Sequence, residues 1–307
     1  MSPRSILLLG ESNVGKSHYG GQLLKRLNKG NGALRMDGAA TNLEPFEEVM
    51  SCLDRGIAAQ HTSSRLYVES TWPVVDGEGR RAELVWPDYG GEQVRSIVAT
   101  RRVPTSWRER AAGTSSWLML VRLGTIRTSD DMLSRRPAEV GGANGKDPSV
   151  PASVAETPDG ASAQTHERKA AGAETTAVAM ELTDQARLIE LLQILVHSRS
   201  AMLGGAGPRP RLGILLTCWD ETGLADGALP RDALMKHLPM FGEFVSSLWH
   251  EPNVLGLSAL ERHLDRKRSD ADFASRGGDR FGYVVLDDGT RSPDLTLPIR
   301  ALVSDES

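Results

Sequence analysis

The chain has 307 residues, of which 39% are hydrophobic and 25% charged, with a formal net charge of -4 at pH 7. These values predict a soluble globular protein, and they exclude both the basic surface of a typical nucleic-acid-binding domain and the low hydrophobicity of a wholly disordered chain. Only Cys52 and Cys218 are present and no apolar run approaches the roughly 18 residues of a membrane span, so we expect a cytoplasmic protein without a disulfide framework or a membrane anchor of its own.

The N-terminal segment predicts a strand, a loop and a helix. Residues 5–9 form a nearly continuous apolar run, which is typical of a strand buried on both faces of a parallel sheet. A glycine-bounded loop follows at 10–17. Leucines then recur at helical spacing until the sequence KGNG at 29–32 ends the helix.

Strand and helix patterns alternate along the rest of the chain. The strand patterns cover 65–76 and 80–89, which the turn DGEG joins, and then 115–124, 210–220 and 253–260. The helical patterns cover 43–56, 182–199 and 230–249. The C-terminal segment adds a strand with a tight turn at Asp288-Gly289 and a short closing helix or strand. This alternation predicts an α/β fold with a largely parallel central sheet.

One segment, from about 125 to 178, does not share this pattern. It consists mainly of Ala, Gly, Pro, Ser, Thr and charged residues and contains no aromatic side chain. Such a composition cannot bury a core. We therefore expect a single domain over residues 1–304, interrupted at about 125–178 by a disordered insertion.

The loop GESNVGKS matches the phosphate-binding pattern Gly-x-x-x-x-Gly-Lys-Ser between a strand and a helix. In such loops the backbone N–H groups wrap the phosphates, the lysine reaches the β and γ oxygens, and the serine hydroxyl binds Mg²⁺. The nucleotide contacts expected here come from Gly10, Ser12, Asn13, Val14, Gly15, Lys16, Ser17 and His18. For His18, plain packing or exposure at the start of the helix is the alternative.

A second carboxylate for the metal is expected at the end of a neighbouring strand. Asp88 ends the strand pattern AELVWPD and stands three residues before Gly91. At that spacing the aspartate orients Mg²⁺ through water while the glycine N–H contacts the γ-phosphate. An ordinary Asp-Tyr-Gly-Gly turn is the alternative.

The identity of the base depends on two later strand ends. Asp220, in ILLTCWDE, can accept hydrogen bonds from N1–H and N2–H₂ of guanine, whereas adenine presents an acceptor at N1. Thr217 opens the same motif. In GLSALE, the backbone of Ser258 and Ala259 is placed to contact the guanine carbonyl. The ligand predicted by these features is GTP or GDP with Mg²⁺.

Four stretches together, GESNVGKS, DYGG, TCWD and SAL, resemble the TRAFAC class of P-loop GTPases, over residues 5–124 and 182–260. More narrowly, WPDYGGEQVRSIV, WRERAAGTSSWLMLVR and TCWDE resemble a bacterial family called double-GTPase-like, whose members are implicated in antiviral or other conflict systems. The resemblance implies a Ras-like, three-layer P-loop NTPase fold and a partner protein that acts as effector or adaptor.

The resemblance also implies the roles of individual residues. Ser17 binds the metal directly, and Asp88 acts on it through water. A switch threonine completes the metal shell. Thr62 is favoured because it lies just before the strand pattern RLYVES, and Thr41 is the alternative.

Two departures from the GTPase pattern bear on affinity and rate. Cys218 stands where a lysine normally lies over the base, so either guanine binding is weaker or Trp219 covers the base instead. Glu92, followed by Gln93, stands where a glutamine normally orients the attacking water. A carboxylate beside the γ-phosphate is electrostatically unfavourable, so slow hydrolysis is expected. The catalytic candidates are Lys16, Gly91, Glu92 and Gln93.

Five arginines follow at close intervals: Arg95, Arg101, Arg102, Arg108 and Arg110. One of them could reach the γ-phosphate and stabilise the transition state. A solvated, partner-facing helix is the alternative, with Trp107 in the core.

Three functions remain open at this point. The leading hypothesis is a GTP-dependent molecular switch with slow, Mg²⁺-dependent hydrolysis that regulates a partner protein in a bacterial system. The alternatives are a nucleotide-locked scaffold without significant turnover and an ATP-dependent phosphoryl-transfer enzyme.

Overall fold

The computed structural model describes residues 4–59, 68–88, 91–126, 183–205 and 207–303. The insertion expected at about 125–178 lies outside these ranges apart from its first two residues, and its extent stays a prediction. The described residues on either side of it belong to one compact unit.

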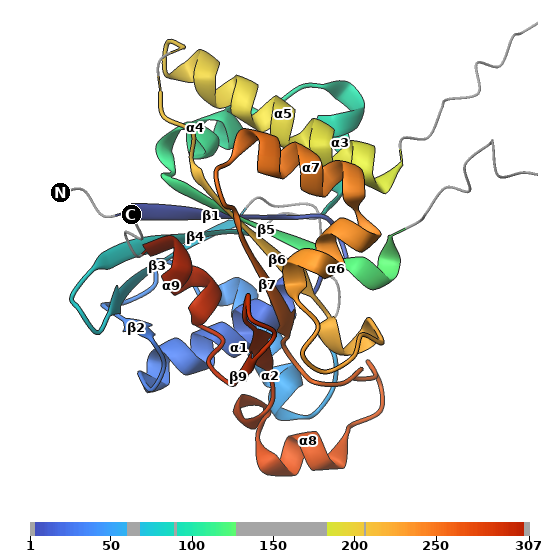
Figure 1. The fold of residues 1–307 in the computed structure, drawn as a ribbon. Helices are drawn as coiled ribbons and strands as arrows, with labels where there is room; N and C mark the ends of the chain where they lie inside the picture. The colour runs from blue at the N-terminus through green and yellow to red at the C-terminus, as the bar shows by residue number, and fades with distance from the viewer. Residues whose placement is uncertain (1–3, 60–67, 89–90, 127–182, 206, 304–307) are drawn as a thin grey trace, which may run out of the picture. The chain divides into compact units, whose positions relative to one another are not determined.

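A twisted sheet crosses this unit in the order β2-β3-β4-β1-β5-β6-β7-β8-β9 (Figure 1). The strands are β1 (Arg4–Gly10), β2 (Leu34–Met36), β3 (Val68–Asp76), β4 (Arg81–Asp88), β5 (Ser116–Arg122), β6 (Arg211–Thr217), β7 (Asn253–Ser258), β8 (Tyr283–Val285) and β9 (Arg291–Ser292). The five central strands, from β4 to β7, are parallel, and the two at each edge pair antiparallel. The expected α/β fold with a largely parallel sheet is confirmed.

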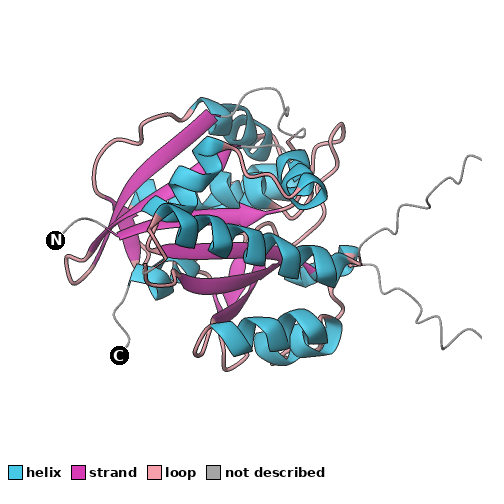
Figure 2. Ribbon diagram, turned by 90° about the horizontal axis from the view of Figure 1, so that it is seen from above, coloured by secondary structure: helices cyan, strands magenta, loops and turns pink. Residues whose placement is uncertain are grey.

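Helices cover both faces of the sheet, which gives three layers (Figure 1). They are α1 (Lys16–Lys29), α2 (Glu44–Asp54), α3 (Gly91–Thr100), α4 (Thr105–Gly113), α5 (Asp184–Met202), α6 (Pro230–His237), α7 (Pro239–Leu248), α8 (Ala271–Arg276) and α9 (Leu297–Val303), with the 3₁₀ turns η1 (Leu123–Thr125), η2 (Trp219–Glu221) and η3 (Gly278–Arg280). Helices α1, α2 and α9 pack on one face, and α3 to α7 pack on the other. Seen from above, helices lie over the strands (Figure 2).

The central strands are apolar throughout because each contributes to two cores. Alternate residues of a strand point to opposite faces. Leu7 and Leu9 accordingly pack with α3 to α7, whereas Ile6 and Leu8 pack with α1 and α9, and all four are fully buried. Burial on both faces explains why residues 5–9 show no polar alternation.

Several elements differ from the sequence prediction, among them α3, α4, α8 and β9, which were not predicted as separate elements. The helix predicted over 230–249 is divided into α6 and α7, because Pro239 has no backbone N–H to continue the ladder and begins a new helix instead. The short edge strand β2 was not predicted. It has only three residues, too few for a periodic pattern to be recognised.

The parallel register brings the carboxyl ends of four central strands to one edge of the sheet. Gly10 is the partner of Leu120 in β5, Arg122 is the partner of Thr217, and Thr217 is the partner of Leu257. Ligands of open α/β sheets bind at this edge. The loops that follow β1, β6 and β7, which carry the predicted site residues, therefore meet there.

Candidate functional site

The loop between β1 and α1 turns sharply at two residues with left-handed backbone. Gly15, the N-cap of α1, has φ 76° and ψ 12°, and Asn13 has φ 65°. Glycine adopts this conformation without a steric penalty, and asparagine tolerates it better than most residues. At Gly10 a Cβ atom would lie 2.9 Å from Val14 Cγ2, so the loop leaves no room for a side chain. Two of the motif's glycines are thus required by the turn itself.

The N-terminus of α1 directs its backbone N–H groups toward this loop. Its first turn carries no acidic residue, and Lys16 donates a long hydrogen bond of 3.5 Å to the Gly10 carbonyl. The helix dipole and the lysine both favour an anion here, and a helix N-terminus typically contributes ~0.3–1 kcal/mol to such binding. The geometry suits a phosphate group.

A partly buried ion pair holds the other side of the phosphate loop. Arg187 of α5 donates to both carboxylate oxygens of Glu11 at 3.0 Å and also pairs with Asp184 at 2.6 Å. The hydrogen bonds to Glu11 raise the pKa of Arg187 above its ordinary value, although burial opposes them. Bidentate pairs of this kind fix orientation as well as charge. They connect the phosphate loop to α5.

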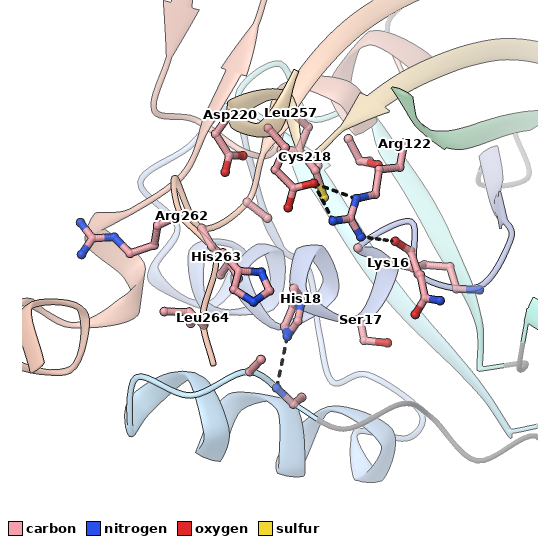
Figure 3. A pocket seen from close by; sticks show the side chains of 18 of the residues that line it. Lys16, Ser17, His18, Arg122, Cys218, Asp220, Leu257, Arg262, His263 and Leu264 are labelled. Carbon is pink, nitrogen blue, oxygen red and sulfur yellow. Dashed lines mark hydrogen bonds and ion pairs between the residues drawn. The ribbon is translucent and has the colours of Figure 1, made fainter. Parts of the chain in front are cut away.

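A cavity of about 660 Å³ extends from this loop to the loops after β6 and β7 (Figure 3). A volume of this size is ordinary for a small-molecule site. Of the predicted nucleotide contacts, its lining includes Ser12, Asn13, Gly15, Lys16, Ser17, His18, Thr217, Asp220 and Ala259. The structure therefore brings together phosphate-loop and base-motif residues that are some 200 positions apart in the chain. Gly10, Val14 and Ser258 do not line it.

Ser258 orients Asp220. Its hydroxyl donates to Asp220 Oδ1 at 2.5 Å and accepts the backbone N–H of Glu261 at 2.9 Å. Ser258 is fully buried. The sequence assigned its backbone to the guanine carbonyl, but the structure also gives its side chain a role, because hydrogen bonds to a charged group contribute about 1.5–3 kcal/mol.

Cys218 and Trp219 occupy opposite environments. The Cys218 thiol lines the cavity, and burial raises its pKa to about 12, so it is a neutral thiol near pH 7. Trp219 is only 4% exposed and packs in the core, where a Cβ on Gly256 would come within 2.7 Å of its ring. The hypothesis that Trp219 covers the base is therefore wrong, because its ring packs against Gly256 of β7.

Arg122, which the sequence analysis did not single out, also lines the cavity. It ends β5, and its guanidinium donates to Glu221 Oε2 at 2.9 and 2.5 Å and to the Asn13 carbonyl at 3.0 Å. The only signal in the sequence is a charged residue at the end of an otherwise apolar strand. That signal places Arg122 at the carboxyl edge of the sheet but does not indicate its hydrogen-bond partners.

Comparison with known families shows that the chain matches the model described as Double-GTPase 1 over residues 7–302. The chain belongs to the Double-GTPase 1 family. A search of curated proteins finds no match. The narrower of the two resemblances, to double-GTPase-like proteins, is thereby confirmed, and GTP or GDP becomes the expected ligand of the cavity.

His18 of this Double-GTPase 1 member has a defined structural contact. Its Nε2 accepts the backbone N–H of Ala59 at 3.2 Å (Figure 3), and both residues line the cavity. The histidine thus ties the first turn of α1 to the loop after α2. Its contact with a nucleotide stays a prediction.

The predicted switch residues are only partly described. Thr62 lies outside the described residues, and so do the side chains of Asp88 and Glu92. The backbone places Asp88 at the last position of β4 and Gly91 at the first position of α3, next to the phosphate loop's edge of the sheet. Thr41, the alternative switch threonine, pairs with β3, since its hydroxyl accepts the Thr71 N–H at 2.9 Å.

Gln93 contacts α4. Its side-chain oxygen accepts the indole N–H of Trp107 at 3.2 Å, and Trp107 is 2% exposed, as expected of a core residue. This contact directs the Gln93 amide toward the junction of α3 and α4. The catalytic role of Gln93 stays a prediction.

The five arginines between Arg95 and Arg110 have separate surroundings. Arg110 pairs with Glu69 at 2.5 Å, and Arg101 pairs with Glu190 at 2.6 Å. Arg95 instead lines a small cavity of about 110 Å³ together with Ser12. Of the five, Arg95 is therefore the one that the structure places beside the phosphate loop.

Two features are absent from the described residues. No helix among them combines the length and hydrophobicity needed to cross a membrane. No group of three or more His, Cys, Asp or Glu side chains in the described ranges is arranged to hold a metal ion. Mg²⁺ at a nucleotide site is held by one or two protein oxygens together with phosphates, and the Ser17 hydroxyl in the cavity fits that donor set.

The raised pKa of Cys218 predicts slow alkylation. At pH 8 a shift from 9.0 to about 12 lowers the thiolate fraction about a thousandfold, and only the thiolate reacts. In a Cys52→Ala background, iodoacetamide should label Cys218 in the folded protein far more slowly than in urea-unfolded protein, with reaction followed by mass spectrometry. Similar rates in both states would contradict a buried, neutral thiol.

Proposed function

We propose that this protein is a cytoplasmic GTP-dependent molecular switch with slow, Mg²⁺-dependent hydrolysis that regulates a partner protein. The observation that carries the proposal is the single cavity shared by the phosphate loop and Asp220. A phosphate cradle alone would accept any nucleoside triphosphate. A carboxylate oriented by Ser258 at the other end of the cavity selects guanine, whose N1–H and N2–H₂ are donors.

Different residues are proposed to bind the phosphates, to hold Mg²⁺ and to contact the γ-phosphate. The N-terminus of α1 and Lys16 offset the phosphate charge, which favours the extra charge of the transition state. Ser17, Thr62 and Asp88 are the proposed holders of Mg²⁺, which when bound neutralises the β and γ oxygens. The Gly91 N–H is assigned to the γ-phosphate, so that loss of this group releases the start of α3.

Slow turnover follows from the residues proposed to position the attacking water. Glu92 presents a carboxylate where a glutamine is usual, and the amide of Gln93 is engaged by Trp107. Repulsion between Glu92 and the γ-phosphate raises the barrier. A long-lived GTP state is what a switch requires, and we infer from the family resemblance that its reader is an effector or adaptor protein of a bacterial conflict system.

Base selectivity is the first test. With Mg²⁺, a fluorescent GDP analogue should bind at least ~100-fold more tightly than the matching ADP analogue, because adenine presents an acceptor, N1, to the Asp220 carboxylate in place of the two donors of guanine. Lys16→Ala should abolish binding. Asp220→Asn should weaken GDP binding ~10–100-fold and reduce the preference for guanine, since its amide presents a donor to N1–H. Fluorescence titration measures each affinity.

Asp232→Asn is the matched control for Asp220→Asn, because Asp232 is exposed on α6 and does not line the cavity. It should leave both affinities unchanged. Equal binding of the two nucleotides by wild-type protein would contradict the assignment of the base, and GDP binding that survives both Lys16→Ala and Asp220→Asn would contradict the assignment of the site.

Single-turnover hydrolysis separates a switch from a locked scaffold. With excess protein and radiolabelled GTP, phosphate release should proceed on the order of 10⁻⁴ s⁻¹, the scale of an unassisted GTPase. Glu92→Gln should accelerate it several-fold by removing the charge beside the γ-phosphate. No release over many hours from either protein would favour the nucleotide-locked scaffold instead.

A further inference from the structure

Arg122 connects the two ends of the cavity. Its guanidinium lies beside Cys218 (Figure 3), where it donates to Glu221 of the base loop and to the Asn13 carbonyl of the phosphate loop. We use "base loop" for Thr217–Glu221. In the described structure this one side chain therefore hydrogen-bonds to both loops that the proposed function assigns to the nucleotide.

The surroundings of Arg122 make this contact well defined. Its side chain is 23% exposed and that of Glu221 is 30% exposed, so the pair is partly shielded from water. Burial opposes the charge on Arg122, but the hydrogen bonds to Glu221 outweigh it and raise the pKa. A partly buried, charge-assisted contact of this kind is stronger than an exposed ion pair.

The base loop lacks a cation of its own. Cys218 stands at the position of the lysine in the guanine-specificity pattern, and a neutral thiol supplies no charge and only one weak S–H donor. The parallel register makes Arg122 the β5 partner of Thr217, one residue before Cys218. The guanidinium of Arg122, from the neighbouring strand, thus supplies beside Cys218 the cation that the base loop lacks.

We propose that Arg122 replaces the lysine that the guanine-specificity pattern has at the position of Cys218. It acts as a positioning and specificity-determining residue, because it fixes the base loop to the phosphate loop. It sets the separation between Asp220 and the phosphate cradle, which a guanine nucleotide must span. This inference rests on the proposed function, because it assumes that guanine nucleotide occupies the cavity. It also means that Cys218 need not lower guanine selectivity.

The test compares nucleotide dissociation from Arg122→Ala and wild-type protein. Release of a fluorescent GDP analogue, chased with excess GDP, should be at least ~10-fold faster from the variant, because charge-assisted hydrogen bonds are lost. The affinity for the ADP analogue should change less than twofold, so the guanine preference falls. Arg122→Lys, which keeps the charge and one donor toward Asn13, should recover part of the loss.

Arg80→Ala is a matched control at the opposite edge of the sheet. Arg80 is 31% exposed and pairs with Asp76 at 2.7 Å in the turn between β3 and β4, so its removal also breaks a partly buried ion pair. The control should lower Tm about as much as Arg122→Ala while leaving GDP release within twofold of wild type. A merely structural role of Arg122 predicts the same unchanged release for both variants.

A double variant tests whether Arg122 replaces the lysine of the guanine-specificity pattern. Cys218→Lys in the Arg122→Ala background returns a cation to the motif, and it should restore slow GDP release to within about threefold of wild type. Failure of this folded double variant to recover would overturn the claim that Arg122 replaces the lysine.

The outcomes separate this inference from the proposed function. If wild-type protein binds no GDP, the proposed function and the inference both fail. If wild-type protein binds GDP and Arg122→Ala releases it at the wild-type rate, the inference alone fails. Faster release with reduced guanine preference supports it.

Discussion

The reversal of the chain between β1 and α1 is the constraint on which the rest of the site depends. Gly10 has no space for a side chain, and Gly15 has a left-handed backbone, so the loop can aim the N-terminus of α1 at one point. The two cores position that point, because β1 lies between β4 and β5 and is buried on both faces. Packing energy thus fixes the position of the proposed phosphate site, and the helix dipole there favours an anion.

The proposed selectivity for guanine has a different physical basis from the proposed binding of the phosphates. Asp220 lies in a short 3₁₀ turn after β6, preceded by Cys218 with φ 52°, an uncommon conformation for a residue other than glycine. Such a turn needs support from its neighbours. Ser258 holds the aspartate from β7 and Arg122 holds the loop from β5, so three adjacent strands converge on the position of a single carboxylate.

Local patterns were enough to predict the central strands, the phosphate loop and the placement of Asp220 at a strand end, because these depend on hydrophobic periodicity and on glycine geometry. They were not enough for contacts between distant side chains. Arg122 meets Asn13 across 109 positions, and nothing in either local sequence indicates the other. The orientation of Trp219 was mistaken for a similar reason: whether its ring faces the cavity or the core is decided by Gly256 on the next strand.

A structure of the protein with GDP and Mg²⁺ tests the central claim most directly. We expect the diphosphate on the N–H groups of residues 10–17, guanine N1 and N2 within about 3 Å of the Asp220 carboxylate, and the Arg122 bridge to Asn13 intact. A nucleotide whose phosphates lie on this loop while its base lies away from Asp220 would contradict it.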